Sequence, residues 1–231
     1  MSISDNYTKI RRDIPDDVTI VVSCKTRSAE EIKEVIAAGA TDLGENYVQE
    51  AGQIFSALEK DAMKVRWHMI GNVQTNKINK ALRIFDVIQT VDSFTKAVAI
   101  DRRIEKARKK RVPVYIEINI GSEFSKAGIK PAEHEPFDEY VEEFVRALSR
   151  LEHIRLEGLM TMGPRFGNPE DVRPYFRMTK EIFEKIKMLD LPNIDMAYLS
   201  MGMTNSYRVA IEEGSNMVRI GTAIFGKRQY E

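Results

Sequence analysis

The sequence is poor in cysteine: Cys24 is the only one among 231 residues. A single thiol excludes an internal disulfide framework and fits a reducing compartment. The chain also lacks net charge, because 35 Lys and Arg balance 35 Asp and Glu, so no overall field attracts nucleic acid or an anionic membrane. No apolar run is long enough to cross a bilayer, and the polar N-terminal stretch lacks the apolar segment of a signal peptide. These absences predict a cytoplasmic protein that binds neither nucleic acid nor membranes.

Two further absences concern metal binding and the domain organisation. No set of His, Cys, Asp and Glu has the spacing of metal ligands, so we expect no metal. No Pro-, Gly- or Ser-rich linker and no shift in composition divides the chain, which predicts one domain over residues 1–231. The basic run at 102–111 contains Glu105 and ends a predicted helix, which favours a solvated helix face over a nucleic-acid surface.

Strand-like and helix-like patterns alternate along the chain. Apolar and β-branched runs predict strands over 19–25, 41–46, 65–71, 85–92, 112–120, 156–162, 195–202 and 217–226. Helical spacing predicts helices over 28–39, 47–60, 76–84, 93–111, 135–153, 170–190 and 206–214. Such alternation, in a length near the ~250 residues of that fold, predicts an α/β protein with a single (β/α)8 TIM barrel and an extra N-terminal helical segment. A doubly wound open sheet is the alternative.

In a barrel, the active face lies at the C-terminal ends of the strands. The loops after the last two predicted strands, "SMGMTNS" (200–206) and "RIGTA" (219–223), supply glycines, hydroxyls and an arginine there. Barrels often hold phosphate in these two loops, with backbone N–H groups as donors. The spacing alone fits a phosphate site and, equally well, tight βα turns that need small residues for geometric reasons.

The strand "TIVVSCK" (19–25) ends on a lysine. Because side chains alternate along a strand, Lys25 shares a face with Val21, and Cys24 faces the helix layer. If Val21 points into the barrel, Lys25 lies at its mouth. One interpretation is a lysine that extends into water. The other is a partly desolvated amine that attacks a carbonyl as a Schiff-base nucleophile. Pyridoxal phosphate and the sugar-phosphate substrate of an aldolase would both connect Lys25 to a phosphate site.

Several motifs in this order resemble one family, the pyridoxal phosphate homeostasis proteins, which are single-domain relatives of the alanine racemase N-terminal barrel. The matching motifs are "GENYVQEA" (44–51), "WHMIGNVQTNK" (67–77), "INIGSEFSKAG" (118–128), "EGLMTM" (157–162), "LSMGM" (199–203) and "VRIGTAIFG" (218–226). Together they cover nearly the whole chain, from about residue 19 to residue 226, and the set is far more specific than any one motif.

The resemblance implies a role for particular residues. Lys25 would hold pyridoxal phosphate (PLP) as a Schiff base and would be the one catalytic residue, and Arg219 would face the pyridine nitrogen. Asn46 and His68 would line the pocket, although a lone strand histidine is as often structural. Independently of the resemblance, Lys126 lies in a predicted loop after a strand, and we consider it as a second, exposed amine for cofactor transfer. The residues expected near the phosphate are Ser200, Gly202, Gly221 and Thr222, and Met201 is expected among the residues that bind the cofactor.

The chain departs from the family pattern in two places. The family commonly has Val-Ser-Lys-Thr at the lysine, whereas this chain has Ser-Cys-Lys-Thr over residues 23–26. Ser206 also stands where the family commonly has an aspartate, which puts any role of that carboxylate in doubt here. The first change keeps the lysine.

The expected function is a protein that stores, buffers or delivers PLP, with at most weak racemase-like activity. An arginine at the pyridine nitrogen disfavours protonation there, which makes the ring a weaker electron sink. A racemase also needs a second acid/base, which in the alanine racemase relatives is a tyrosine from a second domain. A PLP-dependent racemase-like enzyme is the alternative. We expect a monomer, with apo forms of PLP-dependent enzymes as candidate protein partners.

Overall fold

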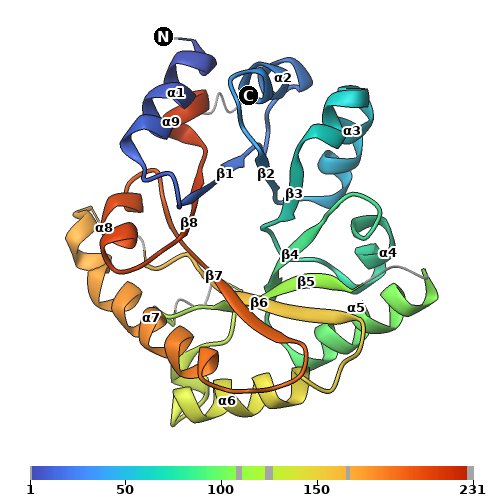
Figure 1. The fold of residues 1–231 in the computed structure, drawn as a ribbon, viewed down its shortest axis with the longest axis vertical. Coiled ribbons are helices and arrows are strands. Elements are labelled where there is room, and N and C mark those ends of the chain that lie inside the picture. Colours follow the sequence, from blue (N-terminus) through green and yellow to red (C-terminus); the bar gives the residue numbers. More distant parts are fainter. Residues whose placement is uncertain (1, 108–110, 123–126, 165–166, 228–231) are drawn as a thin grey trace.

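The computed structural model describes residues 2–107, 111–122, 127–164 and 167–227. Its strands are parallel and form a closed barrel in sequence order, with β8 paired to β1 (Figure 1). The strands are β1 (Thr19–Ser23), β2 (Asp42–Glu45), β3 (Arg66–Met69), β4 (Val87–Val91), β5 (Val112–Ile118), β6 (Ile154–Thr161), β7 (Ile194–Met203) and β8 (Met217–Ile220). This closed order confirms the predicted (β/α)8 barrel over the open sheet.

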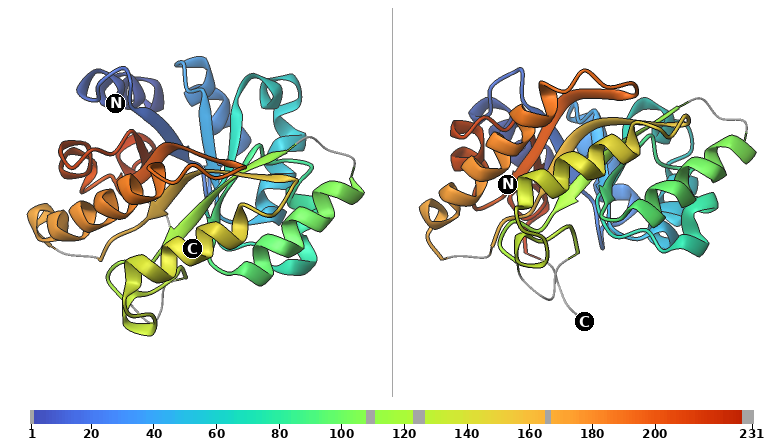
Figure 2. Two further views of the ribbon diagram at one scale, coloured as in Figure 1. Left: turned by 60° about the horizontal axis from the view of Figure 1, so that its bottom comes forward. Right: turned by 90° about the horizontal axis from the view of Figure 1, so that it is seen from below.

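Helices cover the outside of the strands (Figures 1 and 2). They are α1 (Ile3–Asp13), α2 (Ala29–Ala37), α3 (Val48–Leu58), α4 (Ile78–Ala81), α5 (Phe94–Lys106), α6 (Phe137–Leu148), α7 (Arg173–Lys187), α8 (Tyr207–Glu212) and α9 (Thr222–Phe225). Within the described ranges, none of these helices combines the length and apolar character needed to span a bilayer.

The predicted N-terminal helical segment is confirmed as α1. Ser2 begins it with a capping box, in which its hydroxyl accepts from the Asp5 N–H and its own N–H donates to the Asp5 carboxylate. The Asn6 side-chain amide donates to the carbonyl oxygen of Ile224 at 2.9 Å. This bond ties α1 to α9, beside which it lies in Figure 1.

Strand β1 shows how alternation builds two separate cores. Val21 belongs to a small cluster inside the barrel, whereas Ile20, Val22 and Cys24 belong to the large cluster between strands and helices. The faces predicted for Val21 and Cys24 are thereby confirmed. The same alternation directs Ser23 toward the mouth of the barrel, where it lines a cavity.

The last predicted strand, 217–226, is too long. Strand β8 ends at Ile220, which is paired with Val22, and the chain then turns at Gly221 into α9. Pairing stops there because the backbone turns helical: the Gly221 carbonyl oxygen accepts from the N–H groups of Ile224 and Phe225 at 2.9 and 3.0 Å. The apolar residues that suggested a strand, Ile224 and Phe225, are instead buried in the core outside the barrel.

The approach of β6 to β7 predicts one strongly destabilising substitution. A Cβ on Gly158 would lie 2.2 Å from the carbonyl oxygen of Tyr198, a backbone atom that cannot move aside alone. We expect Gly158→Ala to lower the free energy of unfolding by about 1–3 kcal/mol or more, as overpacking does. Urea unfolding measures this effect. Gly167→Ala is the matched control, because no described atom beyond its chain neighbours lies within 4 Å of its added Cβ. Equal stability of the two variants would contradict the prediction.

Candidate functional site

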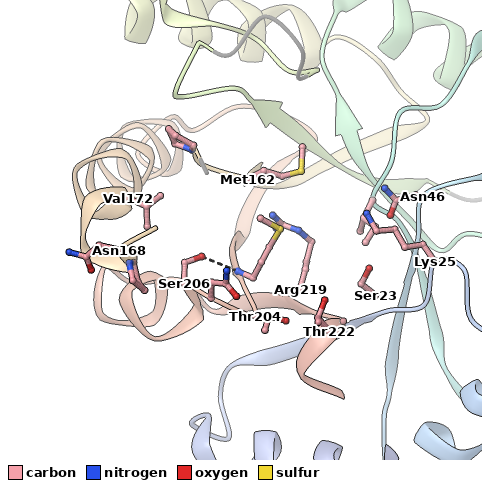
Figure 3. A pocket seen from close by; sticks show the side chains of 16 residues that line it. Ser23, Lys25, Asn46, Met162, Asn168, Val172, Thr204, Ser206, Arg219 and Thr222 are labelled. Carbon is pink, nitrogen blue, oxygen red and sulfur yellow. Dashed lines mark hydrogen bonds between the residues drawn. The ribbon is translucent and has the colours of Figure 1, made fainter. Parts of the chain in front are cut away.

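A cavity of about 400 Å³ opens at the C-terminal ends of the strands (Figure 3). In Figure 3, Lys25 and Asn46 lie on one side and Asn168 and Val172 on the other, with Arg219 between them. The described residues that line it are Ser23, Lys25, Asn46, Ile70, Met162, Pro164, Asn168, Pro169, Val172, Met203, Thr204, Asn205, Ser206, Arg219, Gly221 and Thr222.

Lys25 reaches the cavity from the short loop between β1 and α2. The Cys24 N–H donates to the Gly44 carbonyl oxygen, which continues the β1–β2 pairing one residue beyond the strand. Thr26 then has φ 64, and the Arg27 N–H donates back to the Cys24 carbonyl oxygen at 3.0 Å. This tight turn holds Lys25 half-buried at the mouth of the barrel.

Arg219 stands on β8 with its guanidinium inside the barrel, and only 5% of the residue is exposed. Its NH1 donates to the backbone and hydroxyl oxygens of Ser200 at 2.9 and 2.7 Å, and its NH2 donates to the Thr161 carbonyl oxygen at 2.7 Å. Burial lowers the pKa of Arg219 to about 10, opposed by the charge of Glu117. The guanidinium therefore keeps its proton at neutral pH and presents a buried cation beside the cavity.

The two loops predicted from sequence to hold phosphate meet at the cavity. Thr204 and Ser206 come from the first loop, and Gly221 and Thr222 from the second. The Ala223 N–H donates to the Thr204 hydroxyl at 3.3 Å and joins the loops. These hydroxyl groups and the nearby backbone can donate to an anionic ligand.

Glycine is required where the first of these loops leaves β7. Gly202 has φ +89, and a Cβ there would lie 2.5 Å from the Cβ of Ala210. The backbone at Gly202, near the end of β7, leads the next four residues to the cavity wall, where the Ser206 hydroxyl accepts a hydrogen bond from the Met203 N–H at 3.3 Å.

The structure brings five of the sequence-predicted site residues to the cavity wall. These five are Lys25, Asn46, Arg219, Gly221 and Thr222. The other four lie elsewhere in the described structure: Ser200 behind Arg219, Met201 in the core outside the barrel, Gly202 near the end of β7, and His68 deep inside the barrel. Lys126 lies outside the described residues.

His68 is fully buried between two polar side chains. Its Nε2 lies 2.8 Å from Asp42 Oδ1, and its Nδ1 lies 2.9 Å from Gln89 Nε2. Burial is the largest effect on its pKa and lowers it, against the raising effect of Asp42. Of the two interpretations left open for this histidine, the geometry favours the structural one.

Sequence reasoning missed one complete wall of the cavity. Asn168, Pro169 and Val172 follow β6 at the start of α7. Their only sequence signal is their place after a strand end. Thr204 and Ser206, in contrast, lay within the loop already identified for phosphate.

Two carboxyl groups are buried near the mouth of the barrel. Burial raises the pKa of Glu45 to about 8, with Lys25 acting in the opposite direction, and raises the pKa of Glu117 to about 7. The Oε2 atom of Glu117 is buried without a hydrogen-bond partner, which agrees with a neutral carboxyl group. Across the described residues, no group of three His, Cys, Asp or Glu side chains is placed to hold a metal ion.

Comparisons with known proteins agree on one family. Residues 1–229 match the model of the alanine racemase N-terminal domain. The pyridoxal phosphate homeostasis protein of Aquifex aeolicus is 39% identical over 206 residues, covering 89% of this chain and 85% of its own length. That of Haemophilus influenzae is 39% identical over 215 residues, covering 92% and 86%. The solved structure of PipY from Synechococcus elongatus PCC7942, with PLP bound, has a TM-score of 0.86 at 28% identity and covers 97% of this chain and all of its own.

The buried carboxyl group of Glu117 predicts a pH-dependent stability. The pKa of Glu117 is about 7 in the folded protein against an ordinary value of 4.5, so between these pH values the folded protein keeps a proton that the unfolded chain releases. This contribution to stability is therefore lost as the pH rises from about 4.5 through 7. Glu117→Gln, which stays neutral, should match the wild type at pH 5 and exceed it at pH 8 by on the order of 3 kcal/mol.

Urea unfolding at the two pH values measures this difference. Glu142→Gln is the control, because Glu142 is an exposed partner of Arg146 and should show a change below about 0.5 kcal/mol at both. A Glu117→Gln variant that gains nothing between pH 5 and pH 8 would show that Glu117 is ionised in the fold.

Proposed function

Because this chain belongs to the pyridoxal phosphate homeostasis protein family, whose members are built on the alanine racemase N-terminal domain, we propose that it binds PLP as a Schiff base on Lys25 and stores, buffers or delivers this cofactor. The observation that carries the proposal is the cavity, in which Lys25, Arg219 and the hydroxyls of two loops lie together. We propose that the barrel acts as one PLP-binding unit.

The donor set fits the three polar groups of PLP. An amine, Lys25, suits the aldehyde; the hydroxyls of Thr204, Ser206 and Thr222 suit the phosphate; and the buried guanidinium of Arg219 suits a pyridine nitrogen that accepts a hydrogen bond. A volume of about 400 Å³ lies within the range of small-molecule sites. When bound, PLP supplies an aldehyde whose carbon forms a C=N bond with the Lys25 amine, and the oxygen leaves as water.

Arg219 favours a carrier over the racemase alternative. Racemisation needs a proton-transfer group in addition to the lysine. The ionisable side chains on the described part of the cavity wall are Lys25 and Arg219, and Arg219, with a pKa of about 10, keeps its proton at neutral pH. A guanidinium at the pyridine nitrogen also disfavours ring protonation and weakens the ring as an electron sink. The apoenzyme partners, the monomeric state and the cytoplasmic location stay predictions.

Replacement of Lys25 tests the Schiff base directly. The wild-type protein incubated with PLP should develop the visible absorption of a Schiff base, and borohydride should attach the cofactor to a peptide containing residues 19–27. Lys25→Ala should lose both signals. Lys77→Ala is the control, because Lys77 lines a neighbouring hollow that shares Asn46 with the cavity. Attachment to another lysine in the wild type would refute the assignment.

A separate measurement compares the carrier with the enzyme. PLP-loaded protein is incubated with single enantiomers of individual amino acids, and optical rotation is followed. An enzyme with about 1–10³ turnovers per second would abolish the optical rotation within the measuring time, even at a catalytic amount. A carrier should leave the rotation unchanged over the same time. Rapid loss of rotation with any amino acid would select the racemase alternative.

A further inference from the structure

A chain of hydrogen bonds crosses the interior of the barrel and ends at Arg219. Arg219 NH1 lies 2.7 Å from Ser200 Oγ, Ser200 Oγ lies 2.8 Å from Gln89 Oε1, and Gln89 Nε2 lies 2.9 Å from His68 Nδ1. His68 Nε2 then lies 2.8 Å from the Asp42 carboxylate. Ser200, Gln89 and His68 have no exposed surface, so water cannot substitute for a missing partner in this chain.

The chemistry of each member gives the chain one direction. Because the Gln89 NH2 group can only donate, His68 Nδ1 must accept, and the ring proton is on Nε2, where it is donated to Asp42. Gln89 Oε1 can only accept, so the Ser200 O–H donates to it, and the Ser200 oxygen is left to accept from Arg219. All donors therefore point from Arg219 toward Asp42. The lowered pKa of His68 agrees with the neutral ring that this direction requires.

This direction determines how Arg219 is held. A guanidinium is planar and rigid, so hydrogen bonds that set the direction of NH1 and NH2 also set the direction of its remaining N–H groups. NH1 is held by the two oxygens of Ser200, and NH2 by the Thr161 carbonyl. Of these three oxygens, only the Ser200 hydroxyl can turn, and Gln89 determines which way it turns.

We propose that Ser200, Gln89 and His68 are positioning residues that aim the Arg219 guanidinium into the cavity, with the Asp42 carboxylate as the anionic end of the chain. The consequence for ligand binding rests on the proposed function, since the aimed N–H groups would meet the ring of PLP. If an Arg219 N–H group points at the PLP ring, the ring accepts a charge-assisted hydrogen bond. If the guanidinium points elsewhere, this hydrogen bond is lost.

PLP titration of the apo protein tests this proposal against a purely structural role. Ser200→Ala should weaken PLP binding about tenfold, the effect of losing one charge-assisted hydrogen bond. Ser215→Ala is the matched control. Ser215 is equally a buried hydroxyl, but its hydrogen-bond partners among the described residues are the carbonyl oxygens of Leu199, Met201 and Met217. Its removal should change the dissociation constant less than about twofold.

A double-mutant cycle tests whether Gln89 acts through Ser200. Gln89→Met keeps the side-chain length and removes the hydrogen bonds of Gln89 to Ser200 and His68, together with its longer one to Met217 Sδ at 3.3 Å. It should weaken PLP binding in the wild-type background and add less than about twofold in the Ser200→Ala background. Equal losses in the two backgrounds, or equal dissociation constants for Ser200→Ala and Ser215→Ala, would overturn the proposal and leave PLP binding itself intact.

NMR of the apo protein tests the hydrogen-bond chain from Arg219 to Asp42 in the absence of PLP. His68 should be neutral near pH 7 with its proton on Nε2, and the Nε–H resonance of Arg219 should move in Ser200→Ala and Gln89→Met but not in Ser215→Ala. A proton on Nδ1 of His68, or an Arg219 resonance that ignores both variants, would overturn the proposal. Failure of the wild-type protein to bind PLP would instead refute the proposed function. The His68 and Arg219 resonances would still show whether Ser200 and Gln89 position the guanidinium.

Discussion

Burial of the Arg219 guanidinium removes the water that would otherwise hydrate a cation, and hydrogen bonds from other strands must compensate for it. β6 supplies the Thr161 carbonyl oxygen, and β7 supplies both oxygens of Ser200. Behind Ser200, the barrel interior that an apolar layer would otherwise fill contains Gln89 and His68. The polar interior thus follows from placing one permanent cation at the base of a cavity.

Closure of the barrel brings this cation next to the lysine. β1 and β8 are the first and last strands, and their pairing sets Val21 of β1 beside Arg219 of β8. Two residues beyond Ser23, where β1 ends, Lys25 reaches the same cavity. In an open sheet with the same strands, β1 and β8 would lie apart. The amine and the guanidinium could then not contact the same small ligand.

Particular residues show how far the site could be predicted. Lys25, Gly221 and Thr222 were found because strand ends and glycine-rich loops mark the active face of a barrel. Met201 was expected at the cofactor site together with Ser200 and Gly202, and the alternation of β7 places its side chain in the outer core. The wall formed by Asn168 and Val172 had no sequence signal beyond its place after a strand end, because the path of a long loop depends on the helix that follows it.

By itself, the sequence determined the alternation of strands and helices, the faces of β1 and the family motifs, because these depend on local periodicity and residue type. Only the tertiary structure decided which partner each buried polar group found. Asp42, His68, Gln89 and Ser200 lie on four different strands, and no local pattern records that their side chains meet. Their contacts follow from strand register and barrel closure, which are properties of the whole chain.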